Sequence, residues 1–151
     1  MTIENDINQD KFRNEYQKAT INLIFTYNWM SEKMKYFFDQ FDITSQQFNI
    51  LRILRGAGTP LSTLQIRQRM LDKMSDTSRI VDRLIKKDLV NKSLCKSDKR
   101  LVDITINAKG KKLLEEMDCK NEEIDGVLKN LGESEAKKLN QLLDKIRNEM
   151  D

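Results

Sequence analysis

The side chains with the most specific chemistry lie between Ser75 and Lys87, where hydroxyl, carboxylate and guanidinium groups alternate with apolar residues. At about 100° per residue, the apolar side chains gather on one side of a helix and the polar ones on the other. An arginine on such a polar side can donate two hydrogen bonds to O6 and N7 of guanine, and the major groove of DNA admits one helix. The segment therefore predicts a helix that presents a DNA-binding face.

The expected contacts of this helix differ along its length. Side chains near the N-terminus of a groove-binding helix usually reach the base edges, whereas later cations are better placed for phosphates. We therefore expect base contacts from Ser75, Asp76, Ser78 and Arg79 and phosphate contacts from Arg83 and Lys86, while Thr77 falls on the apolar side of the helix. Asp76 would either accept a hydrogen bond from a cytosine amino group or orient Arg79. The DNA-binding candidates are Ser75, Asp76, Thr77, Ser78, Arg79, Arg83 and Lys86.

The same helix also fits a simpler interpretation. An ordinary surface helix gains stability from opposite charges four residues apart, and Asp82 and Lys86 have that spacing. The helix by itself does not decide between a plain surface and a DNA-binding one.

A short β-hairpin with a basic turn is predicted directly after this helix. Apolar residues alternate with polar ones in residues 90–94 and 102–106, which is the period of a strand. A basic hairpin tip can enter a narrow minor groove, so Lys99 and Arg100 are expected to contact DNA there. Asp98 would orient a neighbouring arginine. The alternative is a tip that only adds solubility.

Helical patterns precede this unit. Apolar residues at helical spacing predict one long helix over residues 10–40. Thr44 and Gln47 form a capping box that opens a second helix, which the glycines and proline of residues 56–60 end. Ser62 or Thr63 caps a third helix, and both are candidates for contacts to the DNA backbone. Ser75 is the predicted N-cap of the fourth helix.

Further helices follow the hairpin. Asn107 is expected to cap a fifth helix that runs from Ala108 to Leu131, with Gly126 as its weak point. Residues 132–134 break the chain before a last helix that contains Leu139 and Ile146. The predicted fold class is mainly α with a small β-hairpin (α+β minor).

Basic charge is concentrated in the centre of the chain. Residues 60–112 contain fourteen Lys and Arg against six Asp and Glu, a net charge of +8, and the other 13 basic and 18 acidic residues give −5. Such an asymmetry is typical of a surface that binds a polyanion. A solvated lysine-rich face is the alternative, but here the charge coincides with the helix and the hairpin.

The composition argues against several other classes of protein. The 151 residues include no histidine and only two cysteines, and no phosphate-binding loop or nucleophile elbow occurs. We therefore expect neither an enzyme nor a metal site or cofactor. No apolar run is long enough to cross a bilayer, and the acidic N-terminus is unlike a signal peptide, so no membrane partner and a cytoplasmic location are expected.

Three stretches of the sequence resemble the MarR family of winged helix-turn-helix transcription regulators. They are residues 43–54 (ITSQQFNILRIL), 78–90 (SRIVDRLIKKDLV) and 98–110 (DKRLVDITINAKG). The order and spacing of these stretches, together with long helices on both sides, make the resemblance specific, and it covers the whole chain. It implies one MarR-like domain over residues 1–151, with a winged helix-turn-helix core at 44–107 and dimerisation helices at 10–40 and 108–151.

The resemblance also implies a mode of action. Members of the family are obligate homodimers that place two recognition helices in successive major grooves of a pseudo-palindromic operator, with the wings at the flanking minor grooves. Many are repressors that a small, often aromatic, ligand releases from DNA. By position, residues 75–79 match the base-reading end of the recognition helix, and Asp98 and Arg100 match the D-x-R of the wing. A sequence-specific, double-stranded-DNA-binding regulator, acting as a repressor, is the leading hypothesis.

The sequence departs from the family pattern at three positions. Asp88 stands where a glycine usually ends the recognition helix, but aspartate tolerates a left-handed conformation. Arg67 occupies a position in the third helix that is often small, so the packing there is expected to differ. Asn107 replaces a frequent threonine and is an equally good cap.

An effector and a thiol sensor are further possibilities. Aromatic residues that could line a pocket for a small aromatic or lipophilic effector, or else pack in the core and the dimer interface, are Phe25, Tyr27, Trp29, Tyr36, Phe37, Phe38 and Phe41. Cys95 lies at the start of the hairpin turn near Lys92 and Lys96, whose charge could lower the thiol pKa. An inert Cys95 is favoured over a redox-sensing one. A winged-helix module that binds protein instead of DNA is the second alternative function.

Overall fold

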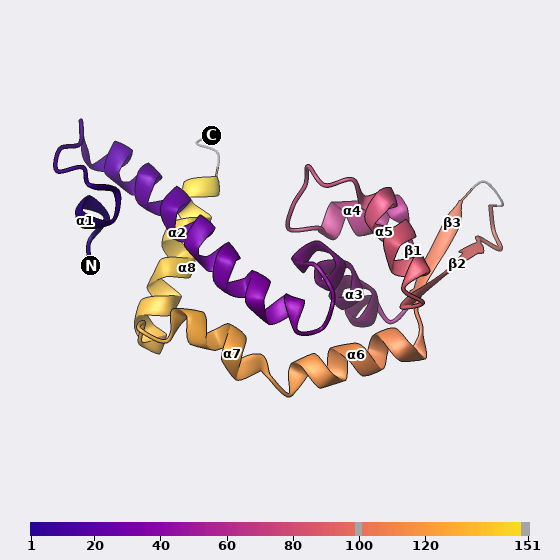
Figure 1. Cartoon of the computed structure of the whole chain (residues 1–151). Helices are drawn as coiled ribbons and strands as arrows, with labels where there is room; N and C mark the ends of the chain where they lie inside the picture. Colours follow the sequence, from indigo (N-terminus) through magenta and orange to yellow (C-terminus); the bar gives the residue numbers. More distant parts are fainter. Residues whose placement is uncertain (99–100, 149–151) are drawn as a thin grey trace.

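A helical core carries a small sheet at one end, and a long helix leads away from it (Figure 1). The computed structural model describes residues 1–98 and 101–148. The helices are α1 (Ile3–Ile7), α2 (Glu15–Asp39), α3 (Ser45–Ala57), α4 (Thr63–Arg69), α5 (Thr77–Lys86), α6 (Ala108–Asp118), α7 (Asn121–Asp125) and α8 (Glu133–Arg147), with a 3-10 turn at Gly126–Leu128. The strands are β1 (Leu61–Ser62), β2 (Val90–Leu94) and β3 (Val102–Ile106). The predicted fold class is confirmed.

The hydrophobic core lies around α3. Ile50 and Leu51 of this helix are fully buried, and they belong to one cluster with Ile66 of α4, Leu84 of α5 and Leu114 of α6. The predicted capping box begins α3: Gln47 N donates to Thr44 Oγ1 at 3.1 Å, and Thr44 N donates to Gln47 Oε1 at 3.1 Å. Because α3 contacts both the sheet and α6, it positions the rest of the domain.

The hairpin belongs to a three-stranded antiparallel sheet of order β1-β3-β2. Val90 pairs with Ile106 and Leu94 with Val102, as the alternation predicts. The third strand was not predicted, because β1 has only two residues and pairs Leu61 with Ile104. Through β1, the hairpin is fixed to the start of α4.

The predicted continuous helix from Ala108 to Leu131 is wrong. It breaks at Cys119 and Lys120 between α6 and α7. The break lets α7 approach the end of α2, where Lys120 Nζ donates to Gln40 Oε1 at 2.9 Å and Gln40 Nε2 donates to Glu123 Oε2 at 3.1 Å. The first helix also differs from the prediction, because Asn14 caps α2 and residues 3–7 form the separate helix α1.

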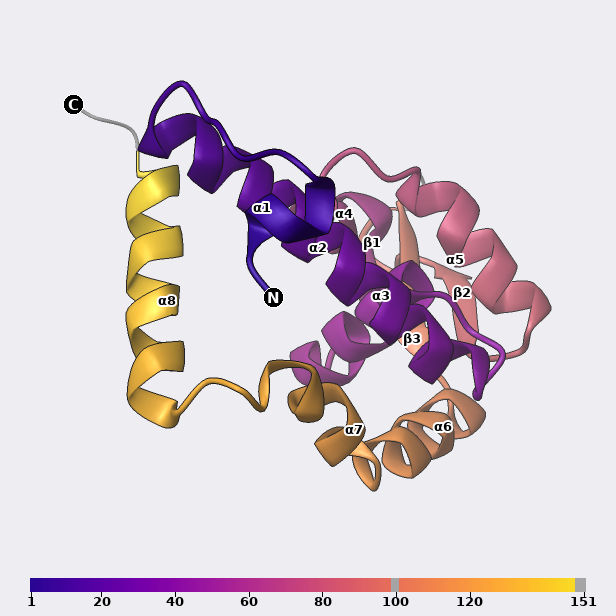
Figure 2. The same cartoon turned by 60° about the vertical axis from the view of Figure 1, so that its left-hand side comes forward.

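The helix α8 stands at the outer edge of the molecule, away from the core around α3 (Figure 2). This 15-residue amphipathic helix contains no buried residue. Among the described residues, no helix is long and apolar enough to cross a membrane.

Candidate DNA-binding surface

The helices α4 and α5 form the helix-turn-helix pair, and β2 and β3 form the wing beside it (Figure 1). One side of α5 is buried through Ile80, Val81 and Leu84. The opposite side, with Ser78, Arg79, Asp82, Arg83 and Lys86, is exposed. The core therefore holds α5 along one side and leaves its polar and basic side chains in solvent, as the helical periodicity predicts.

Asp76, and not Ser75, is the N-cap of α5. Its Oδ1 accepts a hydrogen bond from Arg79 N at 3.2 Å. The Ser75 hydroxyl does not cap the helix but donates a hydrogen bond to the carbonyl oxygen of Asp72, three residues earlier, at 2.8 Å. The prediction of Ser75 as the cap is therefore wrong by one residue. The cap contact gives the Asp76 carboxylate a structural role at the backbone of Arg79.

Thr77 belongs to the core and not to the exposed face. Its exposed fraction is 3%, which leaves almost no surface for a DNA base. Its hydroxyl oxygen has no hydrogen-bond partner among the described residues. A buried hydroxyl without a partner costs free energy, since it has lost its water. This placement argues against the inclusion of Thr77 among the DNA-binding candidates.

Replacing Thr77 with valine should leave the free energy of unfolding unchanged or raise it by up to about 1 kcal/mol, because a methyl group takes the place of the unpaired hydroxyl. Urea unfolding followed by circular dichroism measures this. Thr20→Val serves as the control, since the exposed Thr20 hydroxyl has a partner, Tyr16 O at 2.8 Å. A clear loss of stability in Thr77→Val would mean that the hydroxyl has a partner after all.

Ser62 and Thr63 lie at the start of α4 and are half-buried. Ser62 is the cap: its Oγ accepts from Gln65 N at 3.2 Å, and its backbone N donates to Gln65 Oε1 at 2.9 Å. This reciprocal box settles which of the two predicted residues caps the helix. Their contact with the DNA backbone stays a prediction.

The wing extends beyond the core, because every β2 residue after Val90 is exposed. Two backbone hydrogen bonds close its tip: Cys95 N donates to Leu101 O and Leu101 N donates to Asp98 O, both at 2.9 Å. Asp98 is half-buried. The predicted minor-groove residues Lys99 and Arg100 lie outside the described residues.

Cys95 is half-buried at the base of the tip. Hydrogen bonds from the Ser97 hydroxyl, with the Sγ and Oγ atoms 3.1 Å apart, and from the backbone of Asp98 and Ser97 lower the pKa of its thiol. Asp103 opposes this shift. The direction agrees with the sequence-based expectation, but the cause is local hydrogen bonding and not the neighbouring lysines. The sensor role of Cys95 stays a prediction.

The departures from the family pattern fit the structure. Asp88 adopts a left-handed conformation with φ of 57°, as expected. Asn107 caps α6, since its Oδ1 accepts from Gly110 N at 2.9 Å, and its Nδ2 donates to Asp88 O at 2.8 Å. Arg67 is exposed, so its length does not disturb the packing of α4.

The aromatic residues that were considered for an effector pocket separate into three groups. Phe37 and Phe38 are core residues. Phe25, Tyr27, Trp29 and Tyr36 are exposed on α2. Phe41 lines a cleft of about 510 Å³ beside the end of α5.

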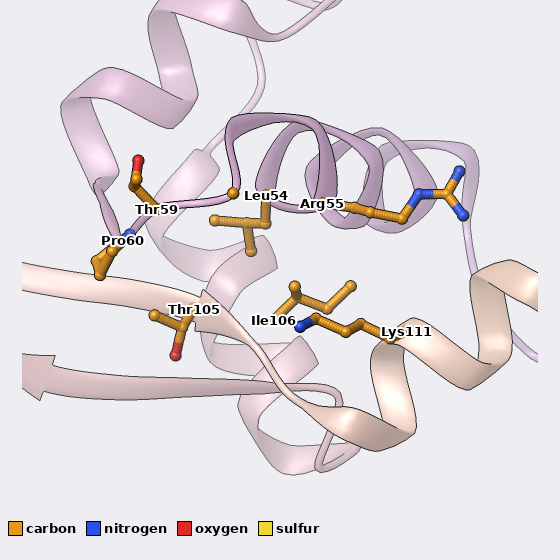
Figure 3. A pocket seen from close by; sticks show the side chains of 8 residues that line it. Leu54, Arg55, Thr59, Pro60, Thr105, Ile106 and Lys111 are labelled. Atoms are coloured by element: carbon orange, nitrogen blue, oxygen red, sulfur yellow. The ribbon is translucent and has the colours of Figure 1, made fainter.

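A smaller pocket of about 190 Å³ lies between the end of α3, β3 and α6, with Leu54 and Lys111 at its wall (Figure 3). No cluster of metal-ligating side chains occurs in the described part of the chain.

Comparisons with known proteins agree with this geometry. Residues 43–102 match the model of the MarR family. A mutant MarR from E. coli complexed with operator DNA is similar in structure, with a TM-score of 0.81 and 21% identity over 92% of this chain and 100% of that one. A MarR transcription factor from Planctomyces limnophilus has a TM-score of 0.66 and 29% identity, with 89% and 98% of the two chains covered.

BpsR from Bordetella bronchiseptica, whose DNA binding 6-hydroxynicotinic acid regulates, has a TM-score of 0.76 and 23% identity over 87% of this chain and 99% of that one. The comparison with curated proteins finds no match. The matched residues contain the helix-turn-helix, β2 and the first residue of β3, and the likeness in structure extends over the flanking helices. Residues 43–102 therefore match the MarR family, and the fold of the whole chain is that of the MarR winged helix-turn-helix structures.

Proposed function

We propose that this protein is a sequence-specific DNA-binding transcription regulator that acts as a homodimer and represses transcription from a pseudo-palindromic operator. The observation that carries the proposal is that α5 has one buried side and one exposed side. Its apolar side is buried against the core, while Ser78, Arg79 and Arg83 stand exposed on the other side. A rigidly held helix with exposed arginine suits the major groove.

Electrostatics support the same surface. The net charge of +8 in residues 60–112 comes from the segment that folds into the helix-turn-helix, the wing and the start of α6. Polyanion binding of this kind releases counterions and depends strongly on salt. We propose the cytoplasm as the location of the protein. MarR from E. coli, which has a similar fold, is known in complex with operator DNA.

The homodimer explains the exposed apolar surface of the flanking helices. In α8, Leu142 is 48% exposed and Ile146 is 66% exposed, although both lie on the apolar side of the helix. On α2, Tyr27 is 69% exposed. An amphipathic helix without buried residues gains little stability by itself and needs a partner surface. A second copy of the chain offers the same helices in return, as a two-fold axis requires.

Release by a small molecule is the regulatory part of the proposal. In BpsR, 6-hydroxynicotinic acid regulates DNA binding. The present chain has a cleft next to the end of α5, so a bound molecule would lie close to the proposed DNA-binding helix.

The role of Arg79 distinguishes sequence-specific from general DNA binding. Replacing it with alanine should weaken binding to the operator by about 1–3 kcal/mol, roughly 5- to 150-fold, with little effect on random DNA, because its expected contacts are with base edges. The measurement is a mobility shift with DNA from beside the protein's own coding region, against a scrambled fragment of equal length.

Arg83→Ala is the matched comparison, since Arg83 is one turn further along the same exposed side of α5. Arg83→Ala should weaken binding to the two fragments equally. It should also reduce the slope of log affinity against log salt concentration by about one. Equal effects of Arg79→Ala on both fragments would show that α5 does not read sequence. If the wild-type chain shifts neither fragment, the fold serves protein binding instead.

A further inference from the structure

The connector between α4 and α5 carries two apolar side chains that the core does not bury (Figure 1). It consists of residues 70–76, in which Leu71 is 84% exposed and Met74 is 93% exposed. Met74 lies two residues before Asp76, the N-cap of α5. Its exposed side chain is therefore next to the end of the helix for which base contacts are proposed.

Asp72 fixes the backbone of this connector. Its Oδ1 accepts a hydrogen bond from Met74 N at 3.0 Å, and its Oδ2 accepts one from Gln46 Nε2 of α3 at 3.1 Å. Its carbonyl oxygen accepts from the Ser75 hydroxyl at 2.8 Å. The backbone of Met74 is thus tied to the central helix of the core. A contact made by Met74 costs less free energy than one from a loose loop, because the backbone is ordered before binding.

The charges around Met74 suit a groove of DNA. Lys73 and Arg79 are exposed cations beside it in the sequence. The two carboxylates of the connector are engaged with backbone N–H groups, Asp72 with that of Met74 and Asp76 with that of Arg79, at 3.0 and 3.2 Å. An apolar side chain among cations has a natural counterpart in the major groove, where the C5 methyl group of thymine is the apolar group on the base edges.

We infer that Met74 contacts the C5 methyl group of one thymine in each half of the operator and makes the protein prefer thymine at that position. The unbranched, flexible side chain of methionine can adapt its shape to such a methyl group. Cytosine has no methyl group at this place, and the contact therefore adds a base preference that needs no hydrogen bond. The inference rests on the proposed function, since it names a base that the proposed DNA-binding surface recognises.

Deoxyuridine isolates the methyl group, because it differs from thymidine by that group alone. The probe is the duplex that the protein protects in a footprint beside its own coding region, synthesised with deoxyuridine in place of one thymidine at a time. In a mobility shift, one position in each half-site should lose affinity for the wild-type protein by about threefold to fivefold, as expected when one methyl group is buried. Full affinity with deoxyuridine at every position would overturn the inference.

Met74→Ala identifies the side chain that makes the contact. This variant should bind the thymidine duplex about threefold to fivefold more weakly than the wild type and should no longer distinguish deoxyuridine from thymidine at that one position. Equal losses of Met74→Ala on the thymidine and deoxyuridine duplexes would overturn the inference, because they would place Met74 against the sugar and phosphate and not against the methyl group.

Leu71→Ala is the matched control. Leu71 is an equally apolar, exposed residue of the same connector, but its backbone N donates to Asn49 Oδ1 of α3 at 2.9 Å and it lies five residues before the cap of α5. The deoxyuridine effect should be unchanged in this variant, and its loss there would assign the methyl contact to the wrong residue. Both variants should unfold in urea like the wild type, since neither side chain is buried.

The same titrations separate this inference from the proposed function. If the wild-type protein prefers the operator duplex to a scrambled one but tolerates deoxyuridine throughout, the inference fails and the proposed function stands. If the wild-type protein binds neither duplex, the proposed function itself fails, and the inference fails with it.

Discussion

A double variant with aspartate in place of Leu142 and Ile146 should dissociate the proposed homodimer at concentrations at which we expect the wild-type chain to be fully dimeric. Each apolar side chain contributes about 1.5–3 kcal/mol when it is buried, and a carboxylate in an apolar interface adds a desolvation cost. A two-fold axis doubles every change, because both copies carry it. The dissociation constant should therefore rise at least about 100-fold. Sedimentation velocity over a dilution series measures it.

Operator binding should fall together with dimerisation, because one recognition helix alone reaches only half of a two-fold site. The monomer should remain folded, since α8 contributes no buried residue to the core. Gln141→Asp is the matched control: it adds the same charged group to the opposite, polar side of the same helix. If the double variant sediments like the wild type, α8 is not the dimerisation helix, and another surface of the chain must cover the exposed face of α2.

Local chemistry accounts for what the sequence predicted well. The start of α3 follows from Thr44 and Gln47, whose side chains bond the backbone within the same turn. Its end follows from Gly58, which takes the left-handed φ of 65° that glycine tolerates. The buried and exposed sides of α5 follow from periodicity alone. Each of these features depends on residues only a few positions apart.

The wrong predictions share a dependence on distant or competing contacts. The break after α6 is stabilised by Lys120 and Gln40, which are 80 positions apart in the sequence. At the start of α5, Ser75 and Asp76 are both good N-cap residues. Asp76 is the cap, because the Ser75 hydroxyl is hydrogen-bonded to the carbonyl oxygen of Asp72. Thr77 is buried because it lies on the same side of α5 as Ile80, Val81 and Leu84. Propensity ranks such candidates but cannot choose between them.

Replacing Gly110 with alanine should destabilise the domain by about 3 kcal/mol, although alanine favours helices. Gly110 lies in the first turn of α6, is buried, and has no room for a side chain. A Cβ atom there would stand 2.3 Å from the carbonyl oxygen of Leu89 and 2.8 Å from Ile106 Cγ1. The first of these is a backbone atom, so relief requires α6 to move away from the wing and not merely a side chain to turn.

The same carbonyl is already held in place, because it accepts a hydrogen bond from Asn107 N at 3.2 Å. Leu89 precedes β2 and Asn107 follows β3, so the glycine allows α6 to pack where the two ends of the wing meet. Its replacement should therefore misplace the wing relative to α6 and the helices that follow it, and weaken DNA binding in the fraction that stays folded. Thermal unfolding and the mobility shift measure the two effects.

Gly56→Ala is the matched control for this prediction. Gly56 is also a helical glycine, but nothing lies within 4 Å of the Cβ position there. Alanine at that position should raise the free energy of unfolding by about 0.5–1 kcal/mol, since it reduces the freedom of the unfolded chain. The two substitutions should change the free energy of unfolding in opposite directions. Their comparison therefore separates the effect of the contact with Leu89 from the effect of helix propensity. If both variants are stabilised, α6 does not pack as closely against the wing as the structure shows.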